Sequence, residues 1–346
     1  MAAMATRVIF RKHGDPDVLE VETFTPAAVG PGQLGVDVAF CGINFGDCVA
    51  RRGFYKAAPP PPACVGFEAS GVVHTVGAGV TDFAVGDRVL CMTRFGGYAS
   101  QLVVATSRAR KLPDGMSLEH AAALPAVYIT AWHCLVHVAR ARAGEHLLIQ
   151  AVAGGVGLAA LQLGKHLGLV TYGTASSPAK LDVARGFGLD HGIDYSKTDF
   201  EAELKALTGG RGVDIVLDSL GGEAFAKGYR SLARGGQIIA IGAAQVAPNS
   251  RNPLELIKAG RAILRGGSYR PLRLVQDNRG MHGVQILYWW DDDAHVTRAV
   301  GELLRLYAQG VVRPVIDGVT PFSQAHRAHA RLESRASTGK LLLRPD

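Results

Sequence analysis

The sequence predicts an α/β protein of two domains, a strand-rich domain followed by one built on a doubly wound parallel sheet. Its 346 residues are enough for two hydrophobic cores. Up to about Ala123, short apolar stretches are separated by glycine and proline, which is typical of strands. After Ser117, strands alternate with helices of about 10–15 residues, as in βαβ units whose strands pair in parallel.

In the strand-rich domain, glycine and proline bound the expected strands. These strands fall within 29–44, 67–80 and 85–92. Ser117 is a plausible N-cap, and an apolar helix is expected from there to about Ala139.

In the part of the chain where strands and helices alternate, apolar runs predict each element. The expected strands are 146–151, 170–175, 191–195, 213–220 and 236–243, and the expected helices are 155–168, 177–188, 200–208 and 224–232.

After about Asn252 the alternation is lost. One more buried strand is expected at GVQILYWW (283–290), then an amphipathic helix at 295–310, and finally a helix and a strand within 322–345 that return to the first domain. The expected domains are therefore residues 1–124 with 292–346, and residues 125–291.

Composition excludes several classes of protein. The chain is 48% hydrophobic and 19% charged, which is ordinary for a globular protein. The net charge of +7 comes from scattered Lys and Arg without a basic block, so no nucleic-acid partner is expected. The five cysteines form no C-x-x-C pair, and no apolar run is long enough to span a membrane. A cytoplasmic protein without disulfides is expected.

The glycine-rich stretch QAVAGGVGLAAL (150–161) is a candidate dinucleotide site. A strand ends at Gln150, Gly154, Gly155, Val156 and Gly157 follow, and a helix begins at once. Backbone N–H groups at a helix N-terminus favour a phosphate, and glycine allows close approach. A plain turn is the alternative, but the position in the first of several βα units favours the cofactor.

The end of the second strand indicates which dinucleotide binds. NAD sites usually carry Asp or Glu about 20 residues after the glycines, whereas this chain has TASS, with no acid until Asp182. Ser176, Ser177, Lys180 and, from the third strand, Tyr195 suit a 2′-phosphate, which predicts NADP. A charge-assisted hydrogen bond of about 1.5–3 kcal/mol would bias selection about tenfold or more. Lys180 as a solvated helix residue is the alternative.

The stretches AVAGGVG, GTASSPAK, GVDIVLDSLGG and GGQIIAIG resemble the medium-chain dehydrogenase/reductase superfamily, as do GINFGDCVARRGFY and GFEASGVV. Within it, the chain is most similar to the zinc-free quinone oxidoreductases, and DSLGGEAFAKGY and NRGMHGVQILYWW resemble the vesicle amine transport protein branch. The resemblance implies a Rossmann cofactor domain, a GroES-like catalytic domain and a homodimer. The edge strand expected around Val284 to Trp289 is the candidate for the dimer contact.

The chain departs from the zinc-dependent members of this superfamily at both aligned ligand positions. Asn44 stands where they have cysteine, and Phe67 where they have the histidine of a G-H-E motif. Phenylalanine cannot ligate a metal and an amide does so poorly, so no metal is expected. His133 and His137 have a spacing that can bind metal, but without a third ligand they are better explained as satisfied or surface histidines.

The resemblance also supplies the other site residues. Asn44 and Asp47 are expected to line the cleft, and Tyr55 to face the substrate as a hydrogen-bond or proton donor. A role of Tyr55 as an apolar lid residue remains an equal alternative. Thr130 and the backbone around Gly242 are expected to hold the nicotinamide end, with Ser219 as a weaker candidate.

The predicted function is zinc-independent hydride transfer from NADPH to a quinone or an α,β-unsaturated carbonyl. The alternatives are an NADPH-binding protein with a membrane- or lipid-associated role, or one that binds RNA. Neither an amphipathic basic helix nor a polybasic tail is evident to favour them.

Overall fold

The structure, a computed structural model, describes residues 4–248 and 252–346. The described residues fall into two compact units. The first unit takes its residues from Met1–Ala126, Trp290–Ala308 and Arg313–Asp346, and the second from Val127–Trp289 and Gln309–Val312.

The second unit is built on a six-stranded sheet in the order β10-β9-β8-β11-β12-β13, and all its pairings are parallel. In chain order this is 3-2-1-4-5-6, the arrangement of doubly wound dinucleotide-binding folds. The strands are β8 His146–Ile149, β9 Val170–Ala175, β10 His191–Asp194, β11 Val213–Asp218, β12 Leu232–Ala240 and β13 Gly280–Gly283.

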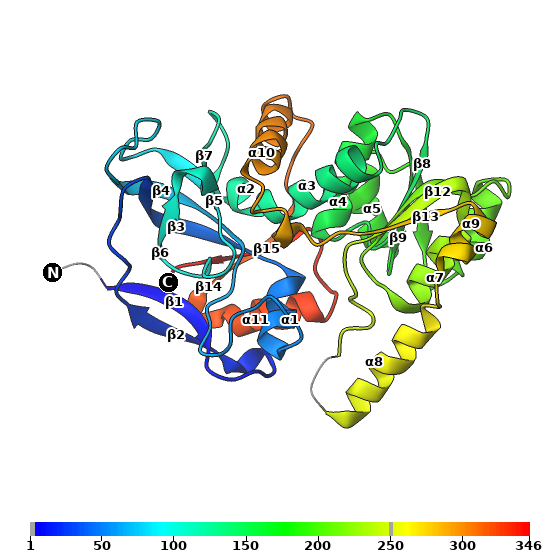
Figure 1. The fold of residues 1–346 in the computed structure, drawn as a ribbon, viewed down its shortest axis with the longest axis horizontal. Helices are drawn as coiled ribbons and strands as arrows, with labels where there is room; N and C mark the ends of the chain where they lie inside the picture. The colour runs from blue at the N-terminus through cyan, green and yellow to red at the C-terminus, as the bar shows by residue number, and fades with distance from the viewer. Residues whose placement is uncertain (1–3, 249–251) are drawn as a thin grey trace. The chain divides into compact units, whose positions relative to one another are not determined.

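Helices connect these strands and cover both faces of the sheet (Figure 1). They are α4 Gly155–His166, α5 Pro178–Gly186, α6 Phe200–Leu207 and α7 Gly222–Arg230. Because β-α-β crossovers are right-handed, the reversal of strand order after β10 sends the later helices to the other face. The predicted fold class is confirmed, and so is the alternation of elements from His146 to Ala240.

The long helix expected from Ser117 to about Ala139 is wrong in one respect, because it is divided. The structure has α2 Leu118–Ala123, α3 Pro125–Trp132 and a π-helical segment His133–Val138. Ser117 does cap the first of these, since its side chain accepts a hydrogen bond from the His120 N–H. Pro125 explains the break after α2, since proline has no N–H to continue the helical hydrogen bonds.

The expectation for the segment from Asn252 to Trp290 is also corrected. The structure forms helices α8 Pro253–Arg265 and α9 Pro271–Asp277, which the sequence pattern did not indicate. The strand expected at 283–290 is β13 Gly280–Gly283 instead, followed by a 3-10 turn Ile286–Tyr288. Its partner β12 ends at Ala240, opposite Gly283, so the residues beyond have no strand to pair with.

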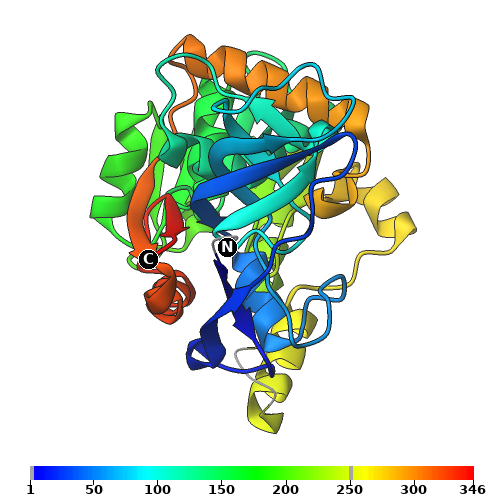
Figure 2. The ribbon, with the colours of Figure 1, turned by 90° about the vertical axis from the view of Figure 1, so that its left-hand side faces the viewer.

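The first unit contains a seven-stranded sheet and a two-stranded one. The larger sheet has the order β14-β15-β3-β4-β5-β7, with β6 paired to β3, and the smaller one joins β1 and β2. The strands are β1 Ala5–Phe10, β2 Leu19–Phe24, β3 Gln33–Ile43, β4 Glu68–Val76, β5 Arg88–Met92, β6 Gln101–Ala105, β7 Ala109–Lys111, β14 Ile316–Pro321 and β15 Lys340–Arg344. Figure 2 shows β15, in red, beside β14.

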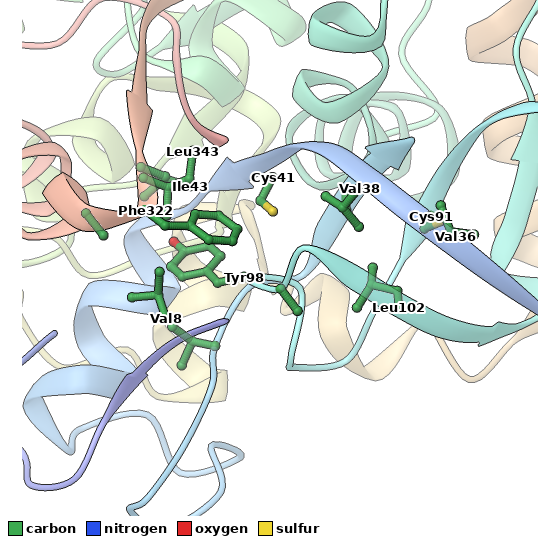
Figure 3. Packing of buried hydrophobic residues seen from close by; sticks show 14 of the residues in the cluster. Val8, Val36, Val38, Cys41, Ile43, Cys91, Tyr98, Leu102, Phe322 and Leu343 are labelled. Atoms are coloured by element: carbon green, nitrogen blue, oxygen red, sulfur yellow. The ribbon is translucent and has the colours of Figure 1, made fainter. Parts of the chain in front are cut away.

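Helices α1 Phe45–Arg52, α10 Asp293–Ala308 and α11 Ala325–Glu333 also belong to the first unit, together with α2. Its core combines residues from both ends of the chain: Val8, Tyr98, Phe322 and Leu343 belong to one buried cluster (Figure 3). This packing and the antiparallel pairing of β15 with β3 bring the C-terminal residues next to Asn44.

Candidate functional site

The carboxyl ends of the parallel strands carry most of the predicted cofactor residues. The strand order reverses between β8 and β11, and ligands of open α/β sheets bind at such a switch point. A nucleotide site is therefore expected among the residues that follow β8, β9, β10, β11 and β12.

The glycines in the turn after β8 lie close to other backbone atoms of the same turn. Gly154 is the N-cap of α4 in an extended conformation with φ −78°, and Gly157 lies so close to the turn that a Cβ there would be 2.4 Å from the Ala151 carbonyl oxygen. The left-handed residue of the turn is Ala151, with φ 52°. Because the helix cannot use the N–H groups of its first turn, those of Gly155, Val156 and Gly157 can bind a phosphate.

The next two strands bring the proposed 2′-phosphate residues to the same edge of the sheet. The Val152 N–H donates to the Thr174 oxygen (3.0 Å), and the Tyr195 N–H donates to the Ala175 oxygen (3.1 Å). Ser176 is exposed and the Tyr195 side chain is 40% exposed, so both hydroxyls can reach a ligand. Ser177 instead caps α5, and its hydroxyl accepts from the Lys180 N–H at 3.5 Å.

Ser219 and Gly242 also lie together, where β11 and β12 end. The Ala244 N–H donates to the Ser219 oxygen (3.1 Å), and a Cβ at Gly242 would be 2.9 Å from that oxygen. The preceding Asp218 is fully buried and accepts from the N–H groups of Leu220 and Gly221. Burial raises the pKa of its carboxyl to about 6.

Thr130 comes from a helix rather than from a strand end. It lies on α3 and is only 8% exposed. Tyr128 on the same helix donates to Gln162 of α4 at 3.1 Å, so α3 packs beside the helix that starts at the glycine turn.

In the first unit, Asn44 immediately precedes α1 and lies between two buried charges. Its amide nitrogen donates to Glu68 Oε1 at 2.9 Å, and its amide oxygen accepts from Lys340 Nζ at 2.6 Å. Lys340 Nζ also lies 2.5 Å from Glu68 Oε1. Glu68 is fully buried and Lys340 is 4% exposed, whereas Asn44 is half-buried.

Asp47 is fully buried beneath Asn44. Its carboxylate accepts from the N–H groups of Asn44 (2.8 Å) and Gly66 (2.9 Å) and from the Tyr98 hydroxyl (2.9 Å). Burial raises the pKa of Asp47 to about 7, against these hydrogen bonds. The carboxyl thus ties the start of α1 to the segment before β4.

Tyr55 belongs to an aromatic cluster centred on Phe67. The Phe67 ring centroid lies 6.1 Å from Tyr55, 5.4 Å from Phe95 and 6.3 Å from Trp290. Phe67 itself is buried, so this position is part of an apolar aromatic cluster.

Among the described residues, no three or more His, Cys, Asp or Glu side chains form a cluster suited to a metal ion. The rings of His133 and His137 stack with their centroids 5.0 Å apart, and the His133 ring packs against Trp289 with a centroid distance of 4.5 Å. Across residues 4–248 and 252–346, no helix is both long and apolar enough to cross a membrane.

Sequence reasoning missed the roles of Glu68, Lys340, Tyr98 and Asp218. A charged residue directly beside an apolar stretch was the available signal for three of them: Glu68 begins β4, Lys340 precedes Leu341–Leu343, and Asp218 follows Ile215–Leu217. For Tyr98 the sequence carries no comparable signal.

The strand order, the glycine turn after the first strand and the separate strand-rich unit define a two-domain dehydrogenase or reductase. Family models agree. The alcohol dehydrogenase GroES-like domain matches residues 30–114, and the zinc-binding dehydrogenase model matches residues 187–343.

Relatives narrow the assignment. The chain is 38% identical to the synaptic vesicle membrane protein VAT-1 homolog of Rattus norvegicus over 94% of this chain and 80% of that protein. It is 35% identical to a quinone oxidoreductase of Salmonella typhimurium over 99% of this chain and 100% of that protein. Among solved structures, Escherichia coli quinone oxidoreductase complexed with NADPH is similar at a TM-score of 0.86 and 32% identity, covering 98% of this chain and 100% of that one.

The chain therefore belongs to the medium-chain dehydrogenase/reductase superfamily, among its quinone oxidoreductase-like members.

Proposed function

We propose that this protein is a zinc-independent reductase that uses NADPH to reduce a quinone or an α,β-unsaturated carbonyl. The observation that carries the proposal is the edge of the sheet after β9, where exposed Ser176 and Tyr195 stand beside each other and no carboxylate follows the strand. The relatives named as quinone oxidoreductases, one of them an NADPH complex, support it.

The residues present fit an NADP cofactor. A carboxylate after β9 would repel a 2′-phosphate, and hydroxyl and ammonium groups would bind it. The residues we assign to the cofactor are the α4 turn Gly154, Gly155, Val156 and Gly157 for the pyrophosphate, Ser176, Ser177, Lys180 and Tyr195 for the 2′-phosphate, and Ser219, Gly242, Thr130 and Asn44 for the nicotinamide end.

The cofactor supplies a hydride when bound, so this chain must orient the acceptor and exclude water. We assign these tasks to the first unit. The half-buried Asn44 amide keeps one N–H that can donate to an oxygen gaining negative charge. Tyr55, in the aromatic cluster around Phe67, is a candidate proton donor. Asp47 holds Asn44 in place by accepting a hydrogen bond from its backbone N–H.

Phe67 carries no ligand atom and the Asn44 amide is already bonded to Glu68 and Lys340, so neither residue offers a zinc site. Electron-poor acceptors such as quinones and enones accept hydride without such activation. A homodimer is part of the proposal, and we assign its contact to β13, Gly280–Gly283, one of the two edge strands of the sheet.

The test is to follow the oxidation of NADPH and NADH by absorbance with a panel of quinones and enones. We expect NADPH to be preferred about tenfold or more. Ser176→Glu should lower kcat/KM for NADPH by about tenfold or more and leave NADH little changed, because it adds a carboxylate after β9. The matched control is Ser268→Glu, at an exposed serine of the second unit.

No turnover with any acceptor despite NADPH binding would refute the reductase. A preference for NADH would refute the 2′-phosphate assignment. Stoichiometric zinc in the purified protein would refute the metal-free chemistry.

A further inference from the structure

A buried ion pair is hydrogen-bonded to both the nitrogen and the oxygen of the Asn44 side-chain amide. Glu68 accepts from its nitrogen at 2.9 Å and Lys340 donates to its oxygen at 2.6 Å. We propose that Glu68 and Lys340 are positioning residues whose task is to hold the Asn44 amide in one orientation, with one N–H left for a ligand. This inference rests on the proposed function of Asn44.

The charges allow only one orientation of the amide. Turning it by 180° would put its oxygen against the Glu68 carboxylate and its NH2 group against the Lys340 ammonium. Both new contacts are repulsive in a buried setting, where such interactions are weakly screened. The amide therefore always offers its nitrogen from the same side.

Both charged groups are themselves fixed. The second carboxylate oxygen of Glu68 accepts from the Ala126 N–H at 2.6 Å, and its first oxygen would be 2.4 Å from a Cβ at Gly42. Lys340 begins β15, and the pairing of Leu341 with Ile43 sets Lys340 beside Asn44. The C-terminal strand, 296 positions away, thus supplies one of the two charged contacts that orient the Asn44 amide.

The pair is out of reach of a ligand. Glu68 is fully buried and Lys340 is 4% exposed, while Asn44 is half-buried. A buried ion pair adds little net stability compared with apolar residues, and retaining one is consistent with a role in specificity. The ammonium on the amide oxygen also polarises the amide, which makes its N–H groups better donors.

Selective labelling with 15N-asparagine reads the orientation directly, because the sequence has four asparagines, Asn44, Asn249, Asn252 and Asn278. The Asn44 side-chain NH2 signals are identified as those lost in Asn44→Ala. In the wild-type protein we expect two widely separated, slowly exchanging proton signals. In Glu68→Gln and Lys340→Met these signals should move together and exchange faster, while in Lys258→Met, at an exposed lysine, they should stay unchanged.

Kinetics test the consequence of this orientation. Lys340→Met should lower kcat with a quinone by about 10- to 100-fold, the range of a charge-assisted hydrogen bond, and Lys340→Arg should recover part of it. In the Asn44→Ala background, Lys340→Met should change kcat by less than about twofold, because it acts through Asn44. NADPH affinity, from fluorescence titration, should follow the same non-additive pattern.

Independent, multiplying losses in the double variant would overturn the inference, as would unchanged Asn44 signals in Glu68→Gln. If Lys340→Met does not fold, Glu68→Gln and Lys340→Arg decide by the same signals and rates. Failure of the proposed function looks different: the wild-type protein would then reduce no acceptor, whether or not it binds NADPH, while the spectra would still report the Asn44 orientation.

Discussion

The carboxyl edge of the sheet in the second unit and the Asn44 network in the first unit are held by contacts of different range. At the sheet edge, the Ala151 N–H reaches Thr174, 23 positions away, and most links join backbone groups of successive strands. In the Asn44 network, the contact of Asn44 with Glu68 spans a similar 24 positions, but its contact with Lys340 joins side chains 296 positions apart.

This difference determines how each region responds to mutation. The sheet edge depends mainly on backbone N–H groups and on closely packed glycine, so substitutions that add atoms should impair it. The Asn44 network depends on charged side chains, so substitutions that remove atoms should impair it. Four predictions test this contrast, from the largest expected effect to the smallest.

Removing one partner of the buried ion pair should have the largest effect. Glu68→Ala leaves the Lys340 ammonium buried without its carboxylate and should lower the free energy of unfolding by about 3–5 kcal/mol. Urea denaturation measures this change. Asp182→Ala, which breaks an exposed pair with Arg185, should cost no more than about 1 kcal/mol; an equal loss in both variants would contradict the contrast.

Each region also contains a buried aspartate whose pKa is raised by burial, Asp218 to about 6 and Asp47 to about 7. In the unfolded chain, an aspartate has a pKa near 4. As the pH rises from about 4 to about 6, the unfolded state therefore loses this proton first, and the free energy of unfolding should fall.

For Asp218 this fall is at most about 3 kcal/mol, and Asp218→Asn should remove it. Asp47 should extend the decline of the wild-type protein to about pH 7, and Asp47→Asn should remove that upper part. Chemical denaturation at a series of pH values measures both. A wild-type stability that rises between pH 4 and 6, with no change of slope in Asp218→Asn, would contradict the prediction.

Adding one carbon at the sheet edge should have an intermediate effect. Gly157→Ala places a Cβ 2.4 Å from the Ala151 oxygen and 2.6 Å from the Val152 oxygen, so the turn must shift. We expect a loss of about 1–3 kcal/mol in the free energy of unfolding, together with weaker NADPH binding in a fluorescence titration. Gly186→Ala is the control: it lies in α5 with nothing within 4 Å of its Cβ, and should not destabilise.

The smallest effect is expected where the turn already stores strain. Ala151 has φ 52°, which costs a non-glycine residue about 1–2 kcal/mol. Ala151→Gly relieves this strain but loses about 0.5–1 kcal/mol of chain entropy, so a net gain of about 0.5–1 kcal/mol is expected in thermal unfolding. Ala153→Gly, in the same turn without a positive φ, should destabilise; equal effects at the two positions would contradict a strained Ala151.

Much of the second unit was predictable because its signals are local. Apolar runs of strand length, helices between them and the glycine cluster are read within a few residues of each other, and the strands from His146 to Ala240 follow them. The prediction failed at Val284–Trp290, where apolar residues look like a strand but β12 ends too early to pair with them. It also missed α8, where several apolar residues remain exposed, including Leu254, Ile257 and Leu264.

The candidate site likewise contains residues that local sequence signals indicated and contacts that they did not. Motif and spacing placed Gly154–Gly157, Ser176 and Tyr195 at one edge of one sheet, since the carboxyl ends of parallel strands always meet there. The sequence also marked Asn44 and Phe67, but not what holds Asn44. Nothing near Lys340 in the chain indicates Asn44 as its partner.

The sequence by itself determined the fold class, the position of the glycine turn and the absence of an acid after β9, because each depends on residues that are neighbours in the chain. Only the tertiary structure decided that Glu68 and Lys340 meet around Asn44, that Asp47 is buried, and that Phe67 faces Tyr55, Phe95 and Trp290. Those contacts depend on the antiparallel pairing of β15 with β3 and on burial, which exist only once distant segments have packed together.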